Sequence, residues 1–518
     1  MGRRGARTAL VAAALVAVCL AGCASGASIT AAPPPSNDAF TAAPPEVVSA
    51  GSSQWPLPGH DYDNTRDAGR SPIDAQSVAR LAPSWTVAMT GELTTVPIIL
   101  GARIYVEDDN GSVVSIDRST GRVLWRSKPL GFSIGPDGVA VGWGKVFAAT
   151  GNGVVALSAT TGSSVWSRRL TTTPSEGVDD QPTVADGRVF VATVPVSAGG
   201  IYKGGDRGWL FALDASTGRT DWSFDTVKSP DIWGNPAVNS GGGAWYPPSI
   251  DVAANRVYWG TANPAPFPGT TQYPNGSSRP GSNLYTDSTL ALDLRSGRLV
   301  WYHQATAHDI FDRDFVHTMI VNIPGASPRQ VIVGTGKSGF VLGYDPTSGR
   351  LLWRTPVGMH HNGELTALSG PTVVLPGTYG GVLTPPASAN GVVYAATLNA
   401  PDTLYPDRTA YFGGKLGTFP GDVVAINALT GKVVWDTTVP GDPTGGATVV
   451  NNLVLTATYQ GTLVAIDRST GRIVMERVLP GAVNGWMAIS DNLVVVPITG
   501  SHPSEVLALR LPGDPPSH

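Results

Sequence analysis

The sequence predicts an all-β protein: an eight-bladed β-propeller over residues 55–511, closed by its N- and C-terminal strands. Three observations lead to this prediction. A strand–turn–strand motif recurs seven times, its closest copies stand about forty residues apart, and each end of the region carries an unpaired half of the motif. Repeats of this length are typical of propellers, in which each repeat is one four-stranded blade.

The recurring motif has alternating apolar residues, Asp or a substitute, a few small or polar residues, Gly, three more residues and a large apolar residue. Its copies end at Trp125, Trp166, Trp222, Trp301, Trp353, Trp435 and Met475. Apolar alternation on both sides of a Ser/Thr-Gly turn predicts a β-hairpin. Two further strands precede most copies, as in "GKVFAATGNG", so each repeat supplies four antiparallel strands.

The ends of the region predict how the ring closes. Trp85, in "APSWTV", stands forty residues before Trp125 with no hairpin turn ahead of it. Near the C-terminus, "EVLALRL" supplies the first strand of the motif without the second. We therefore expect the two ends to complete one blade together, which makes eight blades and leaves no open sheet edge.

The N-terminus predicts export and lipidation. Three arginines within residues 1–7 precede "TALVAAALVAVCLAGC", an apolar segment too short for a secure bilayer span, so residues 1–23 are predicted to be a signal peptide. Leu20-Ala21-Gly22-Cys23 resembles the bacterial lipobox, which predicts lipidation of Cys23 and a folded body outside the cytoplasm, against the cell membrane. The alternative is an uncleaved anchor.

Composition limits the remaining possibilities. Residues 24–54, rich in Ala, Pro and Ser, are predicted to form a flexible tether, and residues 512–518 a short tail. Cys19 and Cys23 are the two cysteines, so no disulfide is expected in the folded body. A net charge of -4 and a pI of about 6.1, with no long basic run after residue 10, argue against nucleic acid as a partner.

One stretch is unusually acidic. "AHDIFDRD", residues 307–314, contains Asp309, Asp312 and Asp314 in a chain in which 14% of residues are charged. It follows the long interval between Trp222 and Trp301, and loops of this kind line the channel mouth of a propeller, where ligands bind. A cation or a proton-transfer role would offset the repulsion between these carboxylates, although a solvated loop or a structural calcium site fits equally well.

Several longer segments resemble the pyrroloquinoline quinone (PQQ) dehydrogenases, eight-bladed quinoprotein alcohol dehydrogenases, and among them the polyvinyl-alcohol-dehydrogenase-like branch. The resemblance covers roughly residues 55–511 and begins with "WPLPGHDYDNTRDAGRSPIDAQSVARLAPSW". Its most specific part is "GGGAWYPPSIDVAANRVYWGTANPAPFPG", followed by "RPGSNLYTDSTLALD" and "HDIFDRD" in the family's order and spacing.

The resemblance implies roles for individual residues. Trp245 corresponds to the tryptophan on which the quinone stacks, and Lys337, in "GKSGF", to the cation that faces the quinone oxygens. Asn263 and Asp312 correspond to ligands of the catalytic metal, and Asp312 also to the proposed general base. Asp314 matches an extra carboxylate of lanthanide-using members, so calcium or a lanthanide is implied.

Two further residues, Thr150 and Trp486, are placed around the cofactor by the same resemblance. Simpler interpretations stay open for several of these positions. Trp245 and Trp486 could be packing residues, and Asn263, which precedes a proline, could be a turn former.

The chain departs from the family pattern at three places. Lys203, in "GGIYKGGDRGWLFALD", stands where the family has a metal-binding glutamate, and Asp137 where it has an arginine beside the cofactor. The vicinal cysteine pair of many members is absent. A lysine that pointed into the site would repel a metal, so these departures bear on the cofactors and not on the fold.

The expected function is the oxidation of an alcohol or polyol with PQQ and a bound cation. The sequence has no haem-attachment motif C-x-x-C-H, so a separate electron acceptor is expected. The alternative is a non-catalytic propeller that binds protein or polysaccharide at the cell envelope. A sugar-binding or sensing module is a third possibility.

Overall fold

The computed structural model describes residues 43–132, 135–196, 202–325, 329–409, 416–500 and 503–513. The predicted signal peptide, the lipidation site Cys23 and most of the predicted tether lie outside these residues. So does most of the predicted tail. No helix in the part of the chain that the structure describes has the length and apolar character needed to cross a membrane.

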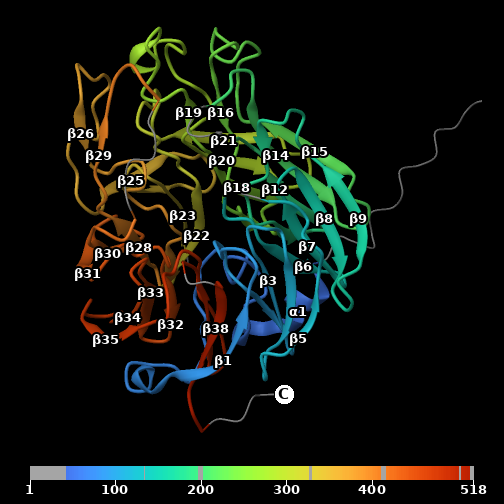
Figure 1. The fold of residues 1–518 in the computed structure, drawn as a ribbon. Helices are drawn as coiled ribbons and strands as arrows, with labels where there is room; N and C mark the ends of the chain where they lie inside the picture. The colour runs from blue at the N-terminus through green and yellow to red at the C-terminus, as the bar shows by residue number, and fades with distance from the viewer. Residues whose placement is uncertain are drawn as a thin grey trace, which may run out of the picture. The chain divides into compact units, whose positions relative to one another are not determined.

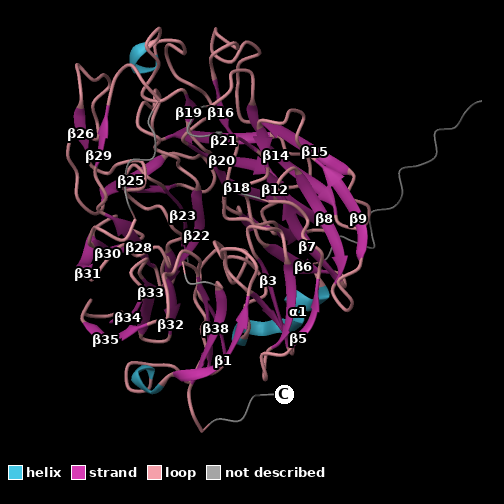
Figure 2. Cartoon of the chain, in the orientation of Figure 1, coloured by secondary structure: helices cyan, strands magenta, loops and turns pink. Residues whose placement is uncertain are grey.

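Eight blades of four antiparallel strands each make up most of the described chain, in which helices are few and short (Figure 2). The sheet of one blade is extended by two further short strands. Blade 1 comprises β2 (Ile98–Leu100), β3 (Arg103–Glu107), β4 (Val113–Asp117) and β5 (Val123–Arg126). Blade 2 comprises β6 (Val139–Gly142), β7 (Lys145–Thr150), β8 (Gly153–Ser158) and β9 (Ser164–Arg169). Blade 3 comprises β11 (Thr183–Ala185), β12 (Arg188–Ala192), β14 (Arg207–Asp214) and β15 (Thr220–Asp225). Blade 4 comprises β17 (Ser249–Asp251), β18 (Arg256–Gly260), β20 (Ser288–Asp293) and β21 (Leu299–Gln304).

The remaining blades repeat the pattern. Blade 5 comprises β22 (His317–Ile323), β23 (Arg329–Thr335), β24 (Phe340–Tyr344) and β25 (Leu351–Pro356). Blade 6 comprises β27 (Ala387–Ala389), β28 (Val392–Leu398), β30 (Gly421–Asn427) and β31 (Val433–Val439). Blade 7 comprises β32 (Thr448–Val450), β33 (Leu453–Ala457), β34 (Thr462–Asp467) and β35 (Ile473–Val478). Blade 8 comprises β36 (Ala488–Ser490), β37 (Leu493–Ile498), β38 (Glu505–Arg510) and the N-terminal β1 (Ala82–Ala88).

Blade 8 joins the two ends of the propeller. β1 pairs antiparallel with β38, in a register that runs from Ala82 opposite Arg510 to Ala88 opposite Glu505. Figure 1 shows the blue β1 beside the red β38. The predicted eight-bladed ring, with its shared closing blade, is confirmed.

The hairpin turns follow from the repeated Asp-x-Ser-Thr-Gly sequence. In blade 1, an Asp117 side-chain oxygen accepts the backbone N–H groups of Ser119 (3.1 Å) and Thr120 (2.9 Å). Gly121 then adopts a φ of +75°, in the left-handed region that glycine enters without steric cost. The motif therefore fixes a tight link between the third and fourth strands.

Each motif tryptophan packs on the turn of the following blade. The Nε1 of Trp125 in blade 1 donates to the carbonyl of Ala159 in blade 2 (3.1 Å), and a Cβ on Gly162 would lie 2.5 Å from the Trp125 ring. Seven such contacts occur, between Trp85 and Gly121, Trp125 and Gly162, Trp166 and Gly218, Trp222 and Gly297, Trp301 and Gly349, Trp353 and Gly431, and Trp435 and Gly471. Both the tryptophan and the glycine of the motif thus form the contact between neighbouring blades, which is called a seam below.

Part of the segment predicted as a tether is structured. α1 (Pro45–Ala50) and a 3-10 turn, η2 (Gly51–Ser53), precede the propeller. The Glu46 carboxylate accepts the backbone N–H groups of Trp143 (2.9 Å) and Gly144 (2.6 Å), and Ala50 is buried. The ordered body thus begins about ten residues before the predicted position 55, because Glu46 and the apolar side of α1 find partners on blades 1 and 2.

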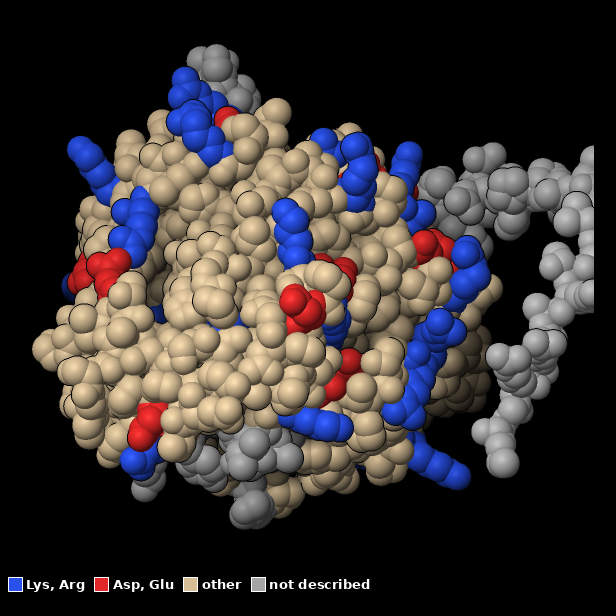
Figure 3. Space-filling view, turned by 90° about the horizontal axis from the view of Figure 1, so that it is seen from above, with Lys and Arg blue, Asp and Glu red and all other residues tan. Residues whose placement is uncertain are grey.

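The long intervals between motifs form loops and short strands on one side of the propeller. They contain β16 (Ser240–Gly242), β19 (Pro264–Ala265), β26 (Thr372–Val374) and β29 (Asp402–Leu404), which lie toward the top of Figure 1. The other short elements are η3 (Val78–Arg80), β10 (Glu176–Gly177), β13 (Val194–Pro195) and η4 (Pro274–Gly276). On the face shown in Figure 3, Lys and Arg side chains are dispersed among uncharged residues.

Candidate active site

Five predicted site residues come from four separate stretches of chain. Trp245 lies between β16 and β17, and Asn263 follows β18. Asp312 and Asp314 precede β22, and Lys337 lies in the short link between β23 and β24. These links belong to blades 4 and 5, and an isolated bridge between Thr261 and Phe315 holds two of them together.

All five residues line one cavity of about 650 Å³, together with Trp486. Pockets of this size are typical of small-molecule and cofactor sites. Thr150, which was also predicted to lie beside the cofactor, is buried at the end of β7 and is not among the residues that line the cavity. The structure thus brings together six of the seven residues predicted around the cofactor and metal.

The charged centre of the cavity is an ion triplet. Lys337 Nζ lies 2.9 Å from Asp312 Oδ2 and 2.6 Å from Asp314 Oδ2. The second oxygen of Asp314 accepts the backbone N–H of Asn263 at 2.8 Å. Burial lowers the pKa of Lys337, but the two carboxylates outweigh burial and hold that pKa above its ordinary value. The ammonium is therefore charged and neutralises part of the acidic cluster.

The third aspartate of the acidic stretch has a structural role. Asp309 accepts the backbone N–H of Phe311 at 2.7 Å and that of Arg313 at 2.6 Å, which fixes the loop. Asp312 and Asp314 adopt φ angles of 63° and 30°, a region that side chains rarely enter. Backbone strain of this kind is concentrated at functional sites, where surrounding contacts enforce it.

Aromatic rings form one wall of the cavity. The Trp245 and Tyr246 ring centroids lie 4.6 Å apart, and those of Tyr246 and Trp486 lie 5.1 Å apart. Lys337 Nζ stands 5.3 Å from the centre of the Trp245 ring, and the Tyr246 hydroxyl donates to the Leu383 carbonyl at 2.8 Å. The half-buried face of Trp245 beside an ammonium suits a flat, electron-poor ring that carries acidic groups.

Lys203 does not occupy the position that the sequence comparison suggested. Its side chain is exposed and is not among the residues that line the cavity, whereas its neighbour Tyr202 is. Asp137 is buried and likewise does not line the cavity. The positive charge expected from Lys203 is therefore not added to the site.

Asp179 is a cavity residue that the sequence analysis missed. It precedes β11, and its Oδ1 is buried with no hydrogen-bond partner among the described residues. The pKa of Asp179 is raised to about 7, first by burial and then by the Asp314 charge, while Lys337 opposes both. The signal was present in the sequence, since "VDDQ" places two acids just before an innermost strand, where residues face the channel.

The donor set suits a cation only in part. The cavity lining contains three carboxylates, of Asp179, Asp312 and Asp314, against the single ammonium of Lys337. Among the described residues, however, no three His, Cys, Asp or Glu side chains converge closely enough to hold a metal ion. The protein thus offers Asn263, Asp312 and Asp314 as oxygen ligands and leaves room in the cavity for a ligand that would supply others.

Family models match two parts of the chain. Residues 171–354, which include five of the predicted site residues, match the β-propeller domain of glucose, ethanol and alcohol dehydrogenases that use PQQ. Residues 82–135 and 420–509 match the model of the outer membrane protein assembly factor BamB. The chain is therefore an eight-bladed propeller, of which residues 171–354 match a PQQ-type domain.

Similar proteins narrow this class. A quinohemoprotein alcohol dehydrogenase of Comamonas testosteroni is 29% identical over 70% of this chain and 56% of its own length. A polyvinylalcohol dehydrogenase of Sphingopyxis sp. (strain 113P3) is 24% identical over 76% of this chain and 68% of its own length. The chain spans about half the length of most of the curated relatives it matches. Quinohemoprotein alcohol dehydrogenases and polyvinylalcohol dehydrogenases are thus its homologues.

Solved structures agree on the fold. The Comamonas testosteroni quinohemoprotein alcohol dehydrogenase superposes with a TM-score of 0.77 at 22% identity, over 91% of this chain and 82% of that one. A europium-containing methanol dehydrogenase gives a TM-score of 0.74 at 21% identity, over 90% of this chain and 100% of that one. BamB from Moraxella catarrhalis gives 0.52 at 15% identity, over 83% of this chain and 99% of that one.

Proposed function

We propose that this protein is a PQQ-dependent dehydrogenase that oxidises an alcohol or polyol outside the cytoplasm, at a membrane to which Cys23 tethers it. One observation carries the proposal. Trp245, Asn263, Asp312 and Lys337, which span more than ninety residues of sequence, meet in one cavity of about 650 Å³. A propeller that served only as a scaffold would have no need to bring an aromatic face, an amide, an acid and a buried lysine together there.

The cavity residues divide the chemistry among them. When bound, PQQ would supply the quinone that takes two electrons from the alcohol. Trp245 would offer the flat surface for that ring, and Lys337 Nζ would place a positive charge beside its oxygens. Asp312 accepts the hydroxyl proton of the alcohol.

Asn263, Asp312 and Asp314 would hold the cation through an amide oxygen and two carboxylates, a set suited to calcium or a lanthanide. Asp179, with an oxygen that lacks a hydrogen-bond partner, adds negative charge to the same cavity. The electrons then leave to a separate acceptor.

A second function is favoured by a specific observation. The blades at the two ends of the propeller match the BamB family model over residues 82–135 and 420–509. This match supports a non-catalytic protein- or polysaccharide-binding propeller at the envelope. Such a protein would bind neither PQQ nor a metal in the cavity.

Titration of PQQ with calcium or lanthanum separates the two functions. We expect the wild-type protein to bind PQQ, with quenching of tryptophan fluorescence, and to oxidise alcohols in a dye-linked assay. Asp312→Ala should lower the rate by about 10²–10⁴-fold, the usual contribution of a general base. Lys203→Glu is the matched control, and it should bind like the wild type because Lys203 is exposed. Absence of binding in all three proteins would support the scaffold.

The membrane tether has its own test. Replacement of Cys23 with Ser should release the protein from the membrane fraction or leave it unprocessed. Unchanged size and unchanged membrane association would contradict lipidation.

A further inference from the structure

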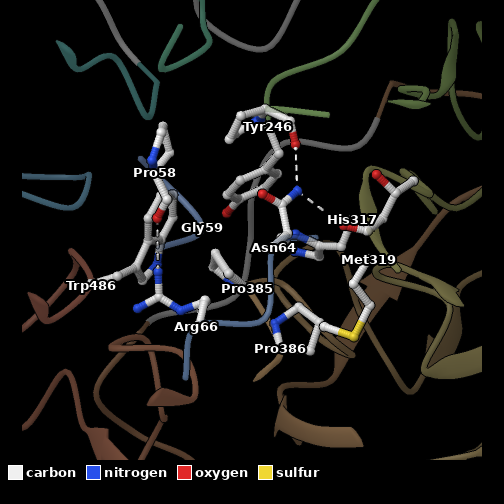
Figure 4. Close-up of a pocket in the computed structure, with 12 residues that line it drawn as sticks. Pro58, Gly59, Asn64, Arg66, Tyr246, His317, Met319, Pro385, Pro386 and Trp486 are labelled. Carbon is white, nitrogen blue, oxygen red and sulfur yellow. Dashed lines mark hydrogen bonds between the residues drawn. The ribbon is translucent and has the colours of Figure 1, made fainter. Parts of the chain in front are cut away.

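A second, smaller cavity lies on the other side of the aromatic wall. Tyr246 and Trp486 line both cavities, so these two rings separate them. The second cavity has a volume of about 30 Å³. This is room for one or two particles the size of a water molecule. Figure 4 shows it, with Arg66 on one side and Asn64 and His317 on the other.

Arg66 of the Asn-Thr-Arg motif has neutral hydrogen-bond partners only. Its Nε donates to the Ala447 carbonyl at 2.8 Å, and one Nη1 hydrogen makes a long contact of 3.4 Å to the Pro58 carbonyl. Its Nη2 donates to Thr448 Oγ1 at 2.9 Å and to the Met487 carbonyl at 3.2 Å. A guanidinium has five N–H groups, so these contacts leave one Nη1 hydrogen without an acceptor.

No carboxylate compensates the charge of Arg66. It forms no ion pair within the part of the chain that the structure describes, and none of the residues lining the small cavity is acidic. The nearest acids in sequence are bound elsewhere: Asp63 accepts the Asn322 amide N–H at 2.6 Å, and Asp67 the backbone N–H of Gly69 at 2.9 Å. Buried charges in proteins are ordinarily paired, because an unpaired one is costly to desolvate.

Another buried arginine, Arg279, shows how nearby carboxylates compensate a guanidinium charge. Arg279 is as inaccessible as Arg66, but the negative charges of Asp309 and Asp287 lie close enough to raise its pKa and so oppose burial. Burial lowers the pKa of Arg66 to about 9, with Tyr246 as the group that opposes it. Arg66 therefore stays charged at neutral pH without an anionic neighbour among the described residues.

Two residues that line the cavity hold unusual backbone conformations. Asn64 and Arg66 adopt φ angles of 58° and 49°, and Asn64 Nδ2 donates to the carbonyls of Pro247 (3.2 Å) and Thr318 (3.1 Å). His317 Nε2 is buried with no hydrogen-bond partner among the described residues. Burial lowers the pKa of His317 to about 3, so its imidazole is neutral and adds no positive charge to the cavity.

We propose that this cavity binds a small monovalent anion of the halide class, with chloride as the natural ligand, beside the guanidinium of Arg66. A halide accepts N–H hydrogens and would neutralise the charge of Arg66, whose guanidinium otherwise faces neutral hydrogen-bond partners and the Trp55 ring, 5.2 Å away. A water molecule would accept the free Nη1 hydrogen of Arg66 but would not neutralise the guanidinium charge. Sulfate and phosphate are too large for the cavity. The site is independent of PQQ, so it can be tested whether or not the dehydrogenase proposal holds.

Bromide tests the site directly. In crystals of the wild-type protein soaked in sodium bromide, we expect an anomalous-scattering peak in the small cavity within hydrogen-bonding distance of Arg66 Nη1. Density at that position without an anomalous signal would identify a water molecule and overturn the proposal. This experiment needs no variant.

Thermal unfolding gives a second, independent readout. At matched ionic strength, chloride or bromide should raise the Tm of the wild-type protein by about 2–4 °C relative to gluconate, since a ligand that binds only the folded state stabilises it. Arg66→Met should lose this halide-specific shift. Arg279→Met is the matched control, which removes an equally buried guanidinium and should keep the shift. A shift that survives in Arg66→Met would place the anion elsewhere and overturn the proposal.

Discussion

Seven seams between blades are joined by a tryptophan, whereas the seam between blades 7 and 8 is not. Blade 7 ends its motif in Met475, which packs in the same apolar cluster as Val78 and Leu81. The reason lies in blade 8. The glycine that receives each tryptophan belongs to the turn between the third and fourth strands of the next blade, and in blade 8 these strands, β38 and β1, come from opposite ends of the chain. There is no turn, so there is no glycine for a tryptophan to contact.

The N-terminal segment covers this seam instead. The Arg477 guanidinium donates to the carbonyls of Leu81 and, at 3.0 Å, of Ala79. Asn451 Nδ2 donates to the Ile73 carbonyl at 2.8 Å. The large residue at the end of a repeat therefore depends on the turn of the next blade, which it contacts, more than on the blade to which it belongs.

The closing seam should be the most sensitive to loss of chain. Deletion of residues 505–518 removes β38, unpairs β1 and exposes two sheet edges. We expect a loss of stability well beyond the roughly 0.5–3 kcal/mol of a typical point mutation. Denaturant unfolding followed by tryptophan fluorescence measures it. A truncated protein that unfolds like the full chain would contradict a ring closed by these strands.

A tryptophan seam should be weakened most by removal of its ring. Trp222 is 7% exposed, packs on Gly297 and donates to the Leu294 carbonyl at 3.0 Å. Trp222→Ala should lower the free energy of unfolding by about 3–5 kcal/mol. Trp222→Phe keeps most of the apolar contact and should cost less, about 0.5–1.5 kcal/mol for the lost hydrogen bond. Equal effects of the two variants would argue against packing as the main contribution.

Insertion of a tryptophan at the eighth seam should not repair it. Met475 is 8% exposed and faces no glycine turn, so Met475→Trp must displace its neighbours. We expect destabilisation by about 1–3 kcal/mol, the usual cost of overpacking. A gain in stability would show that the receiving turn is not what selects the residue.

The smallest expected effect concerns the carboxylates of the seam turns. Hydrogen bonds lower the pKa of Asp117 to about 2, and the one from the Ser119 hydroxyl contributes most. Because the folded-state pKa lies below the unfolded one, this stability is present above about pH 4 and is lost as the pH falls toward 2. Asp117→Asn should remove this pH-dependent part of the free energy of unfolding, which is under about 1 kcal/mol because the carboxylate is largely solvated.

Asn427 provides the control for this pH effect. It makes the same contacts to Thr430 in blade 6 without a titrating group. Asn427→Ala should therefore lower stability equally at pH 3 and pH 7. An Asp117→Asn protein whose stability falls between pH 5 and pH 3 as steeply as that of the wild type would contradict the assignment.

The fold could be read from the sequence because each blade repeats a local signal. Turn chemistry and strand alternation specify the hairpins, and the unmatched Trp85 and "EVLALRL" specify the closing blade. The segment around α1 could not be predicted, because Glu46 is fixed by backbone N–H groups of Trp143 and Gly144, about a hundred residues away.

The candidate site was predictable only where it follows motif spacing. Trp245, Asn263, Asp312 and Lys337 lie in segments that keep the family's order, and all four line the cavity. Lys203 and Asp179 lie in loops whose direction depends on tertiary packing. The resemblance put Lys203 at the position of a metal-binding glutamate and left its direction open, whereas the structure exposes it and places Asp179 in the cavity.

The pairing of β1 with β38 also determines the order of assembly during synthesis. β1 is among the first strands to leave the ribosome, and its partner follows more than four hundred residues later. Until then the outer edge of β38 does not exist, and β1 has no sheet to join. Contacts between such distant segments form slowly, because a long loop must close before they can be made. Blades 1 to 7 can each form from contiguous chain, so the ring is completed by a single late event, after the last strand has been released.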